Sequence, residues 1–152
     1  MSGPLIIDAS VFISAFNPAE PQHGESSRLM ARIRDEGIPL VAPTLVLPEV
    51  AGAISRTTGD SESARSFTER LGTLPGLILV GLDEVLAAQA AEIASAHRLR
   101  GSDAVYGAVS LRFGGPLITL DREQHDRLRP AARTRFPEDA RRELDGQSPR
   151  TK

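Results

Sequence analysis

Four acidic residues, Asp8, Glu49, Asp103 and Asp121, lie far apart in the chain but at comparable places in its pattern. Asp8 and Asp121 each follow a short apolar run typical of a buried strand, and Asp103 lies where a helical segment begins. In an α/β fold such positions meet at one edge of the sheet. Carboxylates brought that close repel one another, and a hard divalent cation with oxygen ligands relieves the repulsion. The pattern therefore predicts a metal site.

Glu49 favours this interpretation most strongly. It lies in the apolar segment 45–51, which is predicted to be a helix that is apolar on nearly all sides and therefore buried. A carboxylate is rarely buried without a partner, and no arginine occurs at helical spacing before Arg56. A distant arginine or a metal ion must therefore satisfy Glu49.

The aspartates also have simpler interpretations. Asp8 and Asp121 follow strands, where Asp commonly caps the next helix. Asp103 lies at a helix start, where the helix macrodipole favours a carboxylate without any function. Glu123 and Asp126 are further acids, which are more simply explained as solvent-facing helix residues. The residue patterns alone leave these alternatives open.

Strand-like and helical segments alternate along the chain. Strands are expected at 5–7, 39–42, 77–80 and 117–120, and helices at 11–16, 23–36, 44–57, 83–98 and 102–113, with one more helix starting at Ser61. This alternation predicts an α/β protein with a mainly parallel sheet covered on both faces. Residues 1–136 are expected to form one domain, and the charged segment 137–152 a weakly held tail.

Composition excludes several kinds of chemistry. The chain has no Cys, so disulfides, thiolate zinc sites and cysteine nucleophiles are excluded. Of its 18 basic residues 17 are Arg, and the lone lysine, Lys152, is terminal. P-loop enzymes, acid-nucleophile phosphatases and receiver domains all need an interior lysine. No apolar run reaches membrane-spanning length, and no basic segment precedes an apolar one at the N-terminus, so we expect a soluble cytoplasmic protein without membrane contact.

Four motifs, taken together, resemble the PIN domain family and, more narrowly, the VapC toxins of type II toxin–antitoxin pairs. They follow the family's order and spacing over roughly residues 4–135. The motifs are Leu5-Ile6-Ile7-Asp8-Ala9-Ser10, Leu47-Pro48-Glu49-Val50, Gly101-Ser102-Asp103-Ala104-Val105-Tyr106 and Leu117-Ile118-Thr119-Leu120-Asp121. The resemblance implies a three-layer α/β/α sandwich and an endoribonuclease that depends on Mg²⁺ or Mn²⁺.

The family's catalytic quartet maps onto Asp8, Glu49, Asp103 and Asp121. We expect Asp8, Asp103 and Asp121 to hold the principal ion, and Glu49 to orient or deprotonate the attacking water.

Other residues are expected to support this site. The family's hydroxyl positions map onto Ser10 and Thr119, which would position the metal ligands through hydrogen bonds. An acidic pocket needs positive charge around it to attract RNA, and Arg98, Arg100 and Arg122 are the candidate RNA-binding residues, although solvation alone also explains surface arginines.

The preferred function is a toxin ribonuclease with a VapB-like antitoxin, acting as a homodimer as the resemblance implies. The alternatives are a PIN-type nuclease of RNA processing or decay without an antitoxin, and a non-catalytic module on the same fold, against which the intact quartet counts. An antitoxin would cover apolar helix faces, or these faces would belong to the protein's own core. The faces in question carry Leu29, Met30, Ile33, Phe67 and Leu71.

Overall fold

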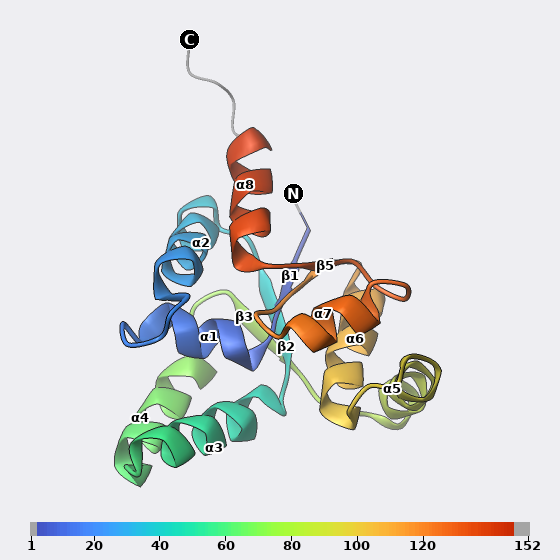
Figure 1. Cartoon of the computed structure of the whole chain (residues 1–152), viewed down its shortest axis with the longest axis horizontal. Helices are drawn as coiled ribbons and strands as arrows, with labels where there is room; N and C mark the ends of the chain where they lie inside the picture. The colour runs from blue at the N-terminus through green and yellow to red at the C-terminus, as the bar shows by residue number, and fades with distance from the viewer. Residues whose placement is uncertain (1–2, 148–152) are drawn as a thin grey trace.

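A parallel five-stranded sheet forms the centre of the protein (Figure 1). The computed structural model describes residues 3–147. The strand order is β3-β2-β1-β4-β5, and every neighbouring pair is parallel. The strands are β1 (Leu5–Ile7), β2 (Leu40–Pro43), β3 (Leu77–Val80), β4 (Leu117–Ile118) and β5 (Thr134–Arg135). The carboxyl ends of all five strands therefore point to the same edge of the sheet.

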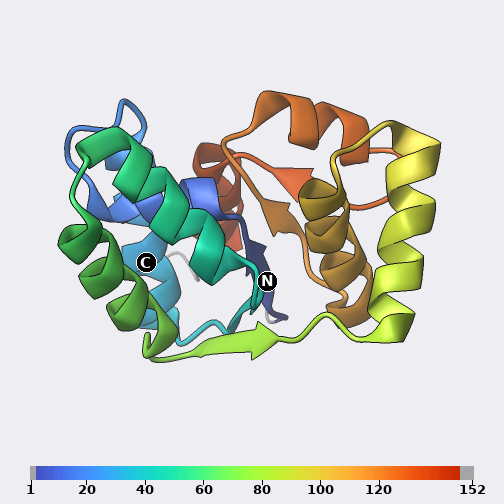
Figure 2. The same cartoon turned by 90° about the horizontal axis from the view of Figure 1, so that it is seen from below.

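Helices cover both faces of the sheet and bury a separate core on each. They are α1 (Ala9–Phe16), α2 (His23–Glu36), α3 (Val46–Thr58), α4 (Ser61–Gly72), α5 (Glu84–His97), α6 (Gly101–Phe113), α7 (Arg122–Leu128) and α8 (Pro137–Gln147). Leu5 and Ile7 of β1 pack with α1 to α4 and α8, whereas Ile6 packs with α5, α6 and α7. Figure 2 shows these two helical layers on opposite sides of the strands. The three-layer α/β/α sandwich predicted from the sequence is confirmed.

Most predicted elements have their expected place, and the bounds of β1, α2 and β3 are those predicted. The strand β5 was not predicted, because its two residues give no hydrophobic period to recognise. The chain enters β4 through Gly115, where a Cβ would collide with the carbonyl oxygen of Pro4. Glycine therefore allows β4 to lie directly beside β1.

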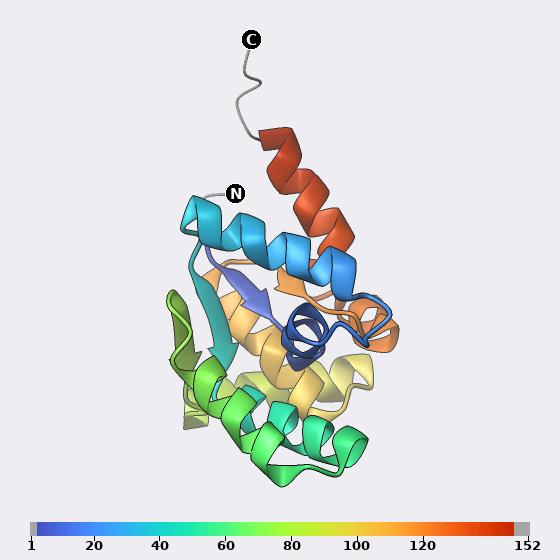
Figure 3. The ribbon, with the colours of Figure 1, turned by 90° about the vertical axis from the view of Figure 1, so that its left-hand side faces the viewer.

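The expectation of a weakly held tail after residue 136 is wrong for residues 137–147, which form α8. This helix packs on α2, as Figure 3 shows for the red and light-blue helices. Ala140 and Leu144 are buried in the core, and Arg141 pairs with Glu25 at 2.8 Å. Residues 148–152 of the predicted tail lie outside the described residues, and a domain boundary at residue 136 stays a prediction.

Within residues 3–147, no helix combines the length and the apolar character that crossing a bilayer requires. The longest, α2 and α5, have 14 residues each, whereas a spanning helix needs about 20 apolar residues. The cytoplasmic location expected from the sequence stays a prediction.

Truncating Leu144 tests whether α8 is part of the folded core. Leu144→Ala should lower the free energy of unfolding by about 2–5 kcal/mol, because it leaves a cavity between α8 and α2. The neighbouring exposed control Arg142→Ala should change it by less than about 1 kcal/mol. Urea unfolding measures both. Equal stability of Leu144→Ala and the parent protein would mean that α8 is not docked.

Candidate active site

The structure brings the four predicted carboxylates to the carboxyl edge of the sheet. Asp8 follows β1 and Asp121 lies between β4 and α7, Glu49 lies on α3 after β2, and Asp103 lies in the first turn of α6. Asp8 caps α1 by accepting a hydrogen bond from the backbone N–H of Ser10, and Asp121 caps α7 by accepting one from the backbone N–H of Gln124. Asp103 makes no such cap. Capping and membership of the cluster therefore coexist at two of the aspartates.

Two hydroxyl groups hold the carboxylate of Asp8. Its Oδ2 accepts hydrogen bonds from Ser10 Oγ at 2.6 Å and from Thr119 Oγ1 at 3.3 Å. Ser10 Oγ in turn accepts from the backbone N–H of Leu120 at 3.1 Å, and Thr119 Oγ1 accepts from that of Asp121 at 3.0 Å. Ser10 and Thr119 therefore connect the end of β1 to the end of β4.

Glu49 has a partner that the sequence analysis did not identify. The Tyr106 hydroxyl donates to Glu49 Oε1 at 2.8 Å, where an arginine or a metal had been expected. Tyr106 is fully buried on α6, one turn after Asp103. Burial, together with the charges of Asp8 and Glu49, raises the pKa of Tyr106, so its hydroxyl stays protonated and donates. Glu49 itself is half-buried, not fully buried as predicted.

Burial and mutual repulsion disfavour the charged forms of three of the acids. Burial raises the pKa of Asp8, and the charge of Asp121 raises it further, against the hydrogen bonds from Ser10 and Thr119. Burial also raises the pKa values of Glu49 and Asp103, and the neighbouring carboxylates add to both shifts. The four acids therefore form one electrostatic unit.

Arg100 contributes positive charge to this unit. Its guanidinium lies 3.4 Å from Asp103 Oδ2 and 3.5 Å from Asp121 Oδ2, and its side chain is 73% exposed. The other two candidate RNA-binding arginines lie elsewhere on α5 and α7. Arg98 ends α5 in the left-handed conformation, and the Arg122 guanidinium lies 5.5 Å from the ring centre of Phe136.

The donor set fits a hard divalent cation by its chemistry. It consists of carboxylate and hydroxyl oxygens, and three of the carboxylates carry charge that burial disfavours. Within residues 3–147, no three acidic or histidine side chains are close enough together to enclose an ion. Binding an ion would therefore draw the carboxylates closer and compete with Arg100 for them.

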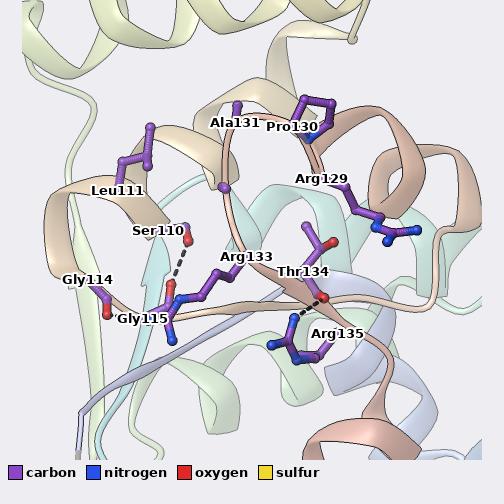
Figure 4. Close-up of a pocket in the computed structure, with 11 residues that line it drawn as sticks. Ser110, Leu111, Gly114, Gly115, Arg129, Pro130, Ala131, Arg133, Thr134 and Arg135 are labelled. Carbon is purple, nitrogen blue, oxygen red and sulfur yellow. Dashed lines mark hydrogen bonds between the residues drawn. The ribbon is translucent and has the colours of Figure 1, made fainter.

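A hollow of about 430 Å³ lies at the amino ends of β4 and β5, away from the acids (Figure 4). The end of α6 and the segment 129–135 line it, and Arg133 donates across it to the carbonyl oxygen of Gly114 at 2.8 Å. None of its lining residues is acidic. The hollow therefore lacks the ligands of a metal site.

The comparisons with known proteins agree with this architecture. The family model for the PIN domain matches residues 5–129, which include all four carboxylates. No curated protein matches the chain. Among solved structures, VapC20 of Mycobacterium tuberculosis, described as a Sarcin-Ricin loop cleaving toxin, has 20% identity and a TM-score of 0.68, covering 79% of this chain and 92% of its own.

Two further solved structures have the same fold. PAE2754 of Pyrobaculum aerophilum has 18% identity and a TM-score of 0.69, and covers 97% of this chain and 92% of its own. A toxin–antitoxin complex from Klebsiella pneumoniae has 14% identity and a TM-score of 0.61, with 88% and 97% covered. At these identities the similarity establishes the fold.

Asp103→Asn should stabilise the metal-free protein progressively as the pH rises. Below the ordinary pKa of 3.8 both folded and unfolded chains are protonated, and the substitution changes little. As the pH rises towards the raised folded value, the unfolded chain releases the proton first, so the parent loses stability that the variant keeps. Thermal unfolding in a chelator between pH 3.5 and 7 measures the difference.

The exposed control Asp35→Asn should show no such trend. An Asp103→Asn variant that is less stable than the parent at pH 7 would mean that the ion pair with Arg100 outweighs burial and repulsion.

Proposed function

We propose that this chain, which belongs to the PIN domain family, is a metal-dependent endoribonuclease acting as the toxin of a toxin–antitoxin pair. The observation that carries the proposal is the placement of Asp8, Glu49, Asp103 and Asp121 at one edge of the sheet, where Thr119 contacts Asp8 and Arg100 contacts both Asp103 and Asp121. The similar fold of VapC20, a toxin described as cleaving the Sarcin-Ricin loop, supports RNA as the substrate class.

Hydrolysis of a phosphodiester needs a nucleophilic water and neutralisation of the charge on the leaving oxygen. A bound Mg²⁺ or Mn²⁺ supplies both. Asp8, Asp103 and Asp121 would hold it. Ser10 and Thr119 fix the carboxylate of Asp8 by hydrogen bonds, so that its orientation is set before an ion binds.

Glu49 is the proposed base for the attacking water. Tyr106 holds its Oε1, so the second carboxylate oxygen can accept a proton from water. Burial raises the pKa of Glu49, which brings it nearer to neutral pH and makes it a stronger base. Tyr106 therefore acts as a positioning residue for Glu49.

Arg100 is the proposed contact for the RNA backbone. Its exposed guanidinium lies beside two of the acids and can transfer from them to a phosphate when a cation takes its place. Arg98 and Arg122 are weaker candidates for the same role, since their side chains are exposed but make no ion pair with the site acids. With a net charge of -2, the protein needs such local positive charge to bind RNA.

An antitoxin partner fits the exposed apolar surface around Phe16. This side chain is 48% exposed at the end of α1 and packs against Phe67 of α4 with ring centres 5.8 Å apart. It borders a mainly apolar hollow of about 650 Å³ between α2 and β3, which Met30 also lines. The toxin–antitoxin complex from Klebsiella pneumoniae, which shares the fold, supports an antitoxin as the partner, and the apolar lining of the hollow favours an apolar segment as the occupant.

The helix faces considered from the sequence divide between the core and this surface. Leu29, Ile33 and Leu71 are buried in the core next to β1 and β2. Met30 and Phe67 are partly exposed and border the hollows around Phe16. Of the five apolar helix residues named from the sequence, only Met30 and Phe67 therefore belong to the proposed antitoxin surface.

A second apolar surface fits the proposed homodimer. Leu82 and Val85 at the start of α5 and Leu111 near the end of α6 are exposed. The Arg112–Asp83 ion pair at 2.9 Å holds these two helix ends together. A second copy of the chain would cover apolar side chains that otherwise face water.

Removing one carboxylate at a time tests the nuclease proposal. Asp8→Asn, Glu49→Gln, Asp103→Asn and Asp121→Asn should each lower Mg²⁺-dependent cleavage of total RNA at least 100-fold, because the acids act as a unit. Asp126→Asn, which removes an exposed acid outside the unit, should keep parental activity. Full activity in any quartet variant would remove that residue from the mechanism, and cleavage in excess chelator would contradict the metal requirement.

The antitoxin surface is tested by placing a charge on it. Phe16→Glu should abolish copurification with the VapB-like antitoxin, sought as the product of a short gene next to the gene for this chain, because a carboxylate would face the apolar segment of the partner. Val85→Glu, a change at a more exposed residue of the other apolar surface, should leave copurification intact. If Phe16→Glu copurifies as well as the parent, the antitoxin binds elsewhere.

A further inference from the structure

One buried polar side chain next to the site has no role in the proposed mechanism. Gln124 lies in α7, a helix of mostly charged residues, yet it is completely buried. Burying an amide costs stability unless both of its ends form hydrogen bonds. Its position therefore needs an explanation other than core packing.

Gln124 contacts Asp121 directly and is linked to Asp8 through Thr119. Its side-chain Oε1 lies 2.7 Å from Thr119 Oγ1, which lies 3.3 Å from Asp8 Oδ2. Its backbone N–H donates to Asp121 Oδ1 at 3.1 Å. Thr119 thus links the amide of Gln124 to the carboxylate of Asp8.

The hydrogen bonds around Thr119 are in competition. A threonine hydroxyl carries one proton, and here both Gln124 Oε1 and Asp8 Oδ2 lie within reach of it. Within the described part of the chain, Gln124 Nε2 is buried without any hydrogen-bond partner. If the amide turns over, Nε2 donates to Thr119 Oγ1 and the Thr119 proton goes to Asp8.

We propose that Gln124 is a positioning residue of the active site: its amide directs the Thr119 hydroxyl and, through it, fixes the carboxylate of Asp8 for the metal ion. The inference rests on the proposed nuclease function and adds a residue to it. A purely structural residue here would be Met or Leu, which fill a similar volume without an unpaired amide. Polar groups that lower stability are expected where a site needs them.

Gln124→Met tests the proposal, because it keeps the side-chain length and removes only the amide. The melting temperature of the metal-free protein should stay equal or rise, since the unpaired amide is gone. The rise in melting temperature that Mn²⁺ produces should shrink, and RNA cleavage should fall about 10- to 100-fold. Gln89→Met on α5 is the matched control and should behave as the parent.

A double-mutant cycle shows whether Gln124 acts through Thr119. In a Thr119→Val background, Gln124→Met should cause no further loss of cleavage or of the Mn²⁺ response, because the link to Asp8 is already broken. Independent, additive losses would overturn the proposal.

Two other results would also overturn it. Gln124→Met could match the parent in cleavage and Mn²⁺ response, or it could lower the melting temperature together with activity, which is the mark of a structural role. A parent protein that neither cleaves RNA nor responds to Mn²⁺ would instead refute the nuclease function, and the role of Gln124 with it.

Discussion

Negative charge concentrated at the carboxyl edge of one parallel sheet is the constraint on which the rest of the site depends. Buried carboxylates are unfavourable when charged, and here three of them also repel one another. Each relieving contact comes from a different part of the chain: Ser10 and Thr119 for Asp8, Tyr106 for Glu49, and Arg100 for Asp103 and Asp121. The partners reduce the repulsion without removing it, which leaves the site suited to a cation.

The fold tolerates this repulsion because its two apolar cores, one on each face of the sheet, include none of the four acids. Alternate residues of β1 pack into opposite helical layers, so the strand that ends at Asp8 is anchored on both faces. At Asp8 and Asp121 one carboxylate both caps a helix and belongs to the acidic cluster. The cap and the site, which the sequence presents as alternatives, are therefore two uses of the same geometry.

Local sequence patterns predicted the parts of the structure that depend on local interactions. Short apolar runs predicted the strands, and the acids near strand ends and helix starts were predicted to gather at one edge of the sheet, because parallel strands end at a common edge. The bond between Tyr106 and Glu49 joins residues 57 apart in the chain, and no local pattern encodes it. Gln124 was missed because a glutamine in a polar helix is ordinarily exposed.

The helix α8 was missed for a similar reason. Its only buried apolar side chains among the described residues beyond Pro137 are Ala140 and Leu144, one helical turn apart, in an otherwise charged segment. Such a narrow stripe is too weak to identify from composition, and the ion pair between Arg141 and Glu25 that adds to it joins distant segments.

Anomalous X-ray scattering from crystals of the protein grown with Mn²⁺ tests most directly whether the acidic cluster is a metal site. We expect a manganese peak bound by Asp8 and at least one of Asp103 and Asp121, with oxygen ligands at about 2.0–2.2 Å. The guanidinium of Arg100 should have moved away from the carboxylates. The absence of a peak among these residues at saturating Mn²⁺, with Arg100 still paired to Asp103 and Asp121, would mean that the acidic cluster is not a metal site.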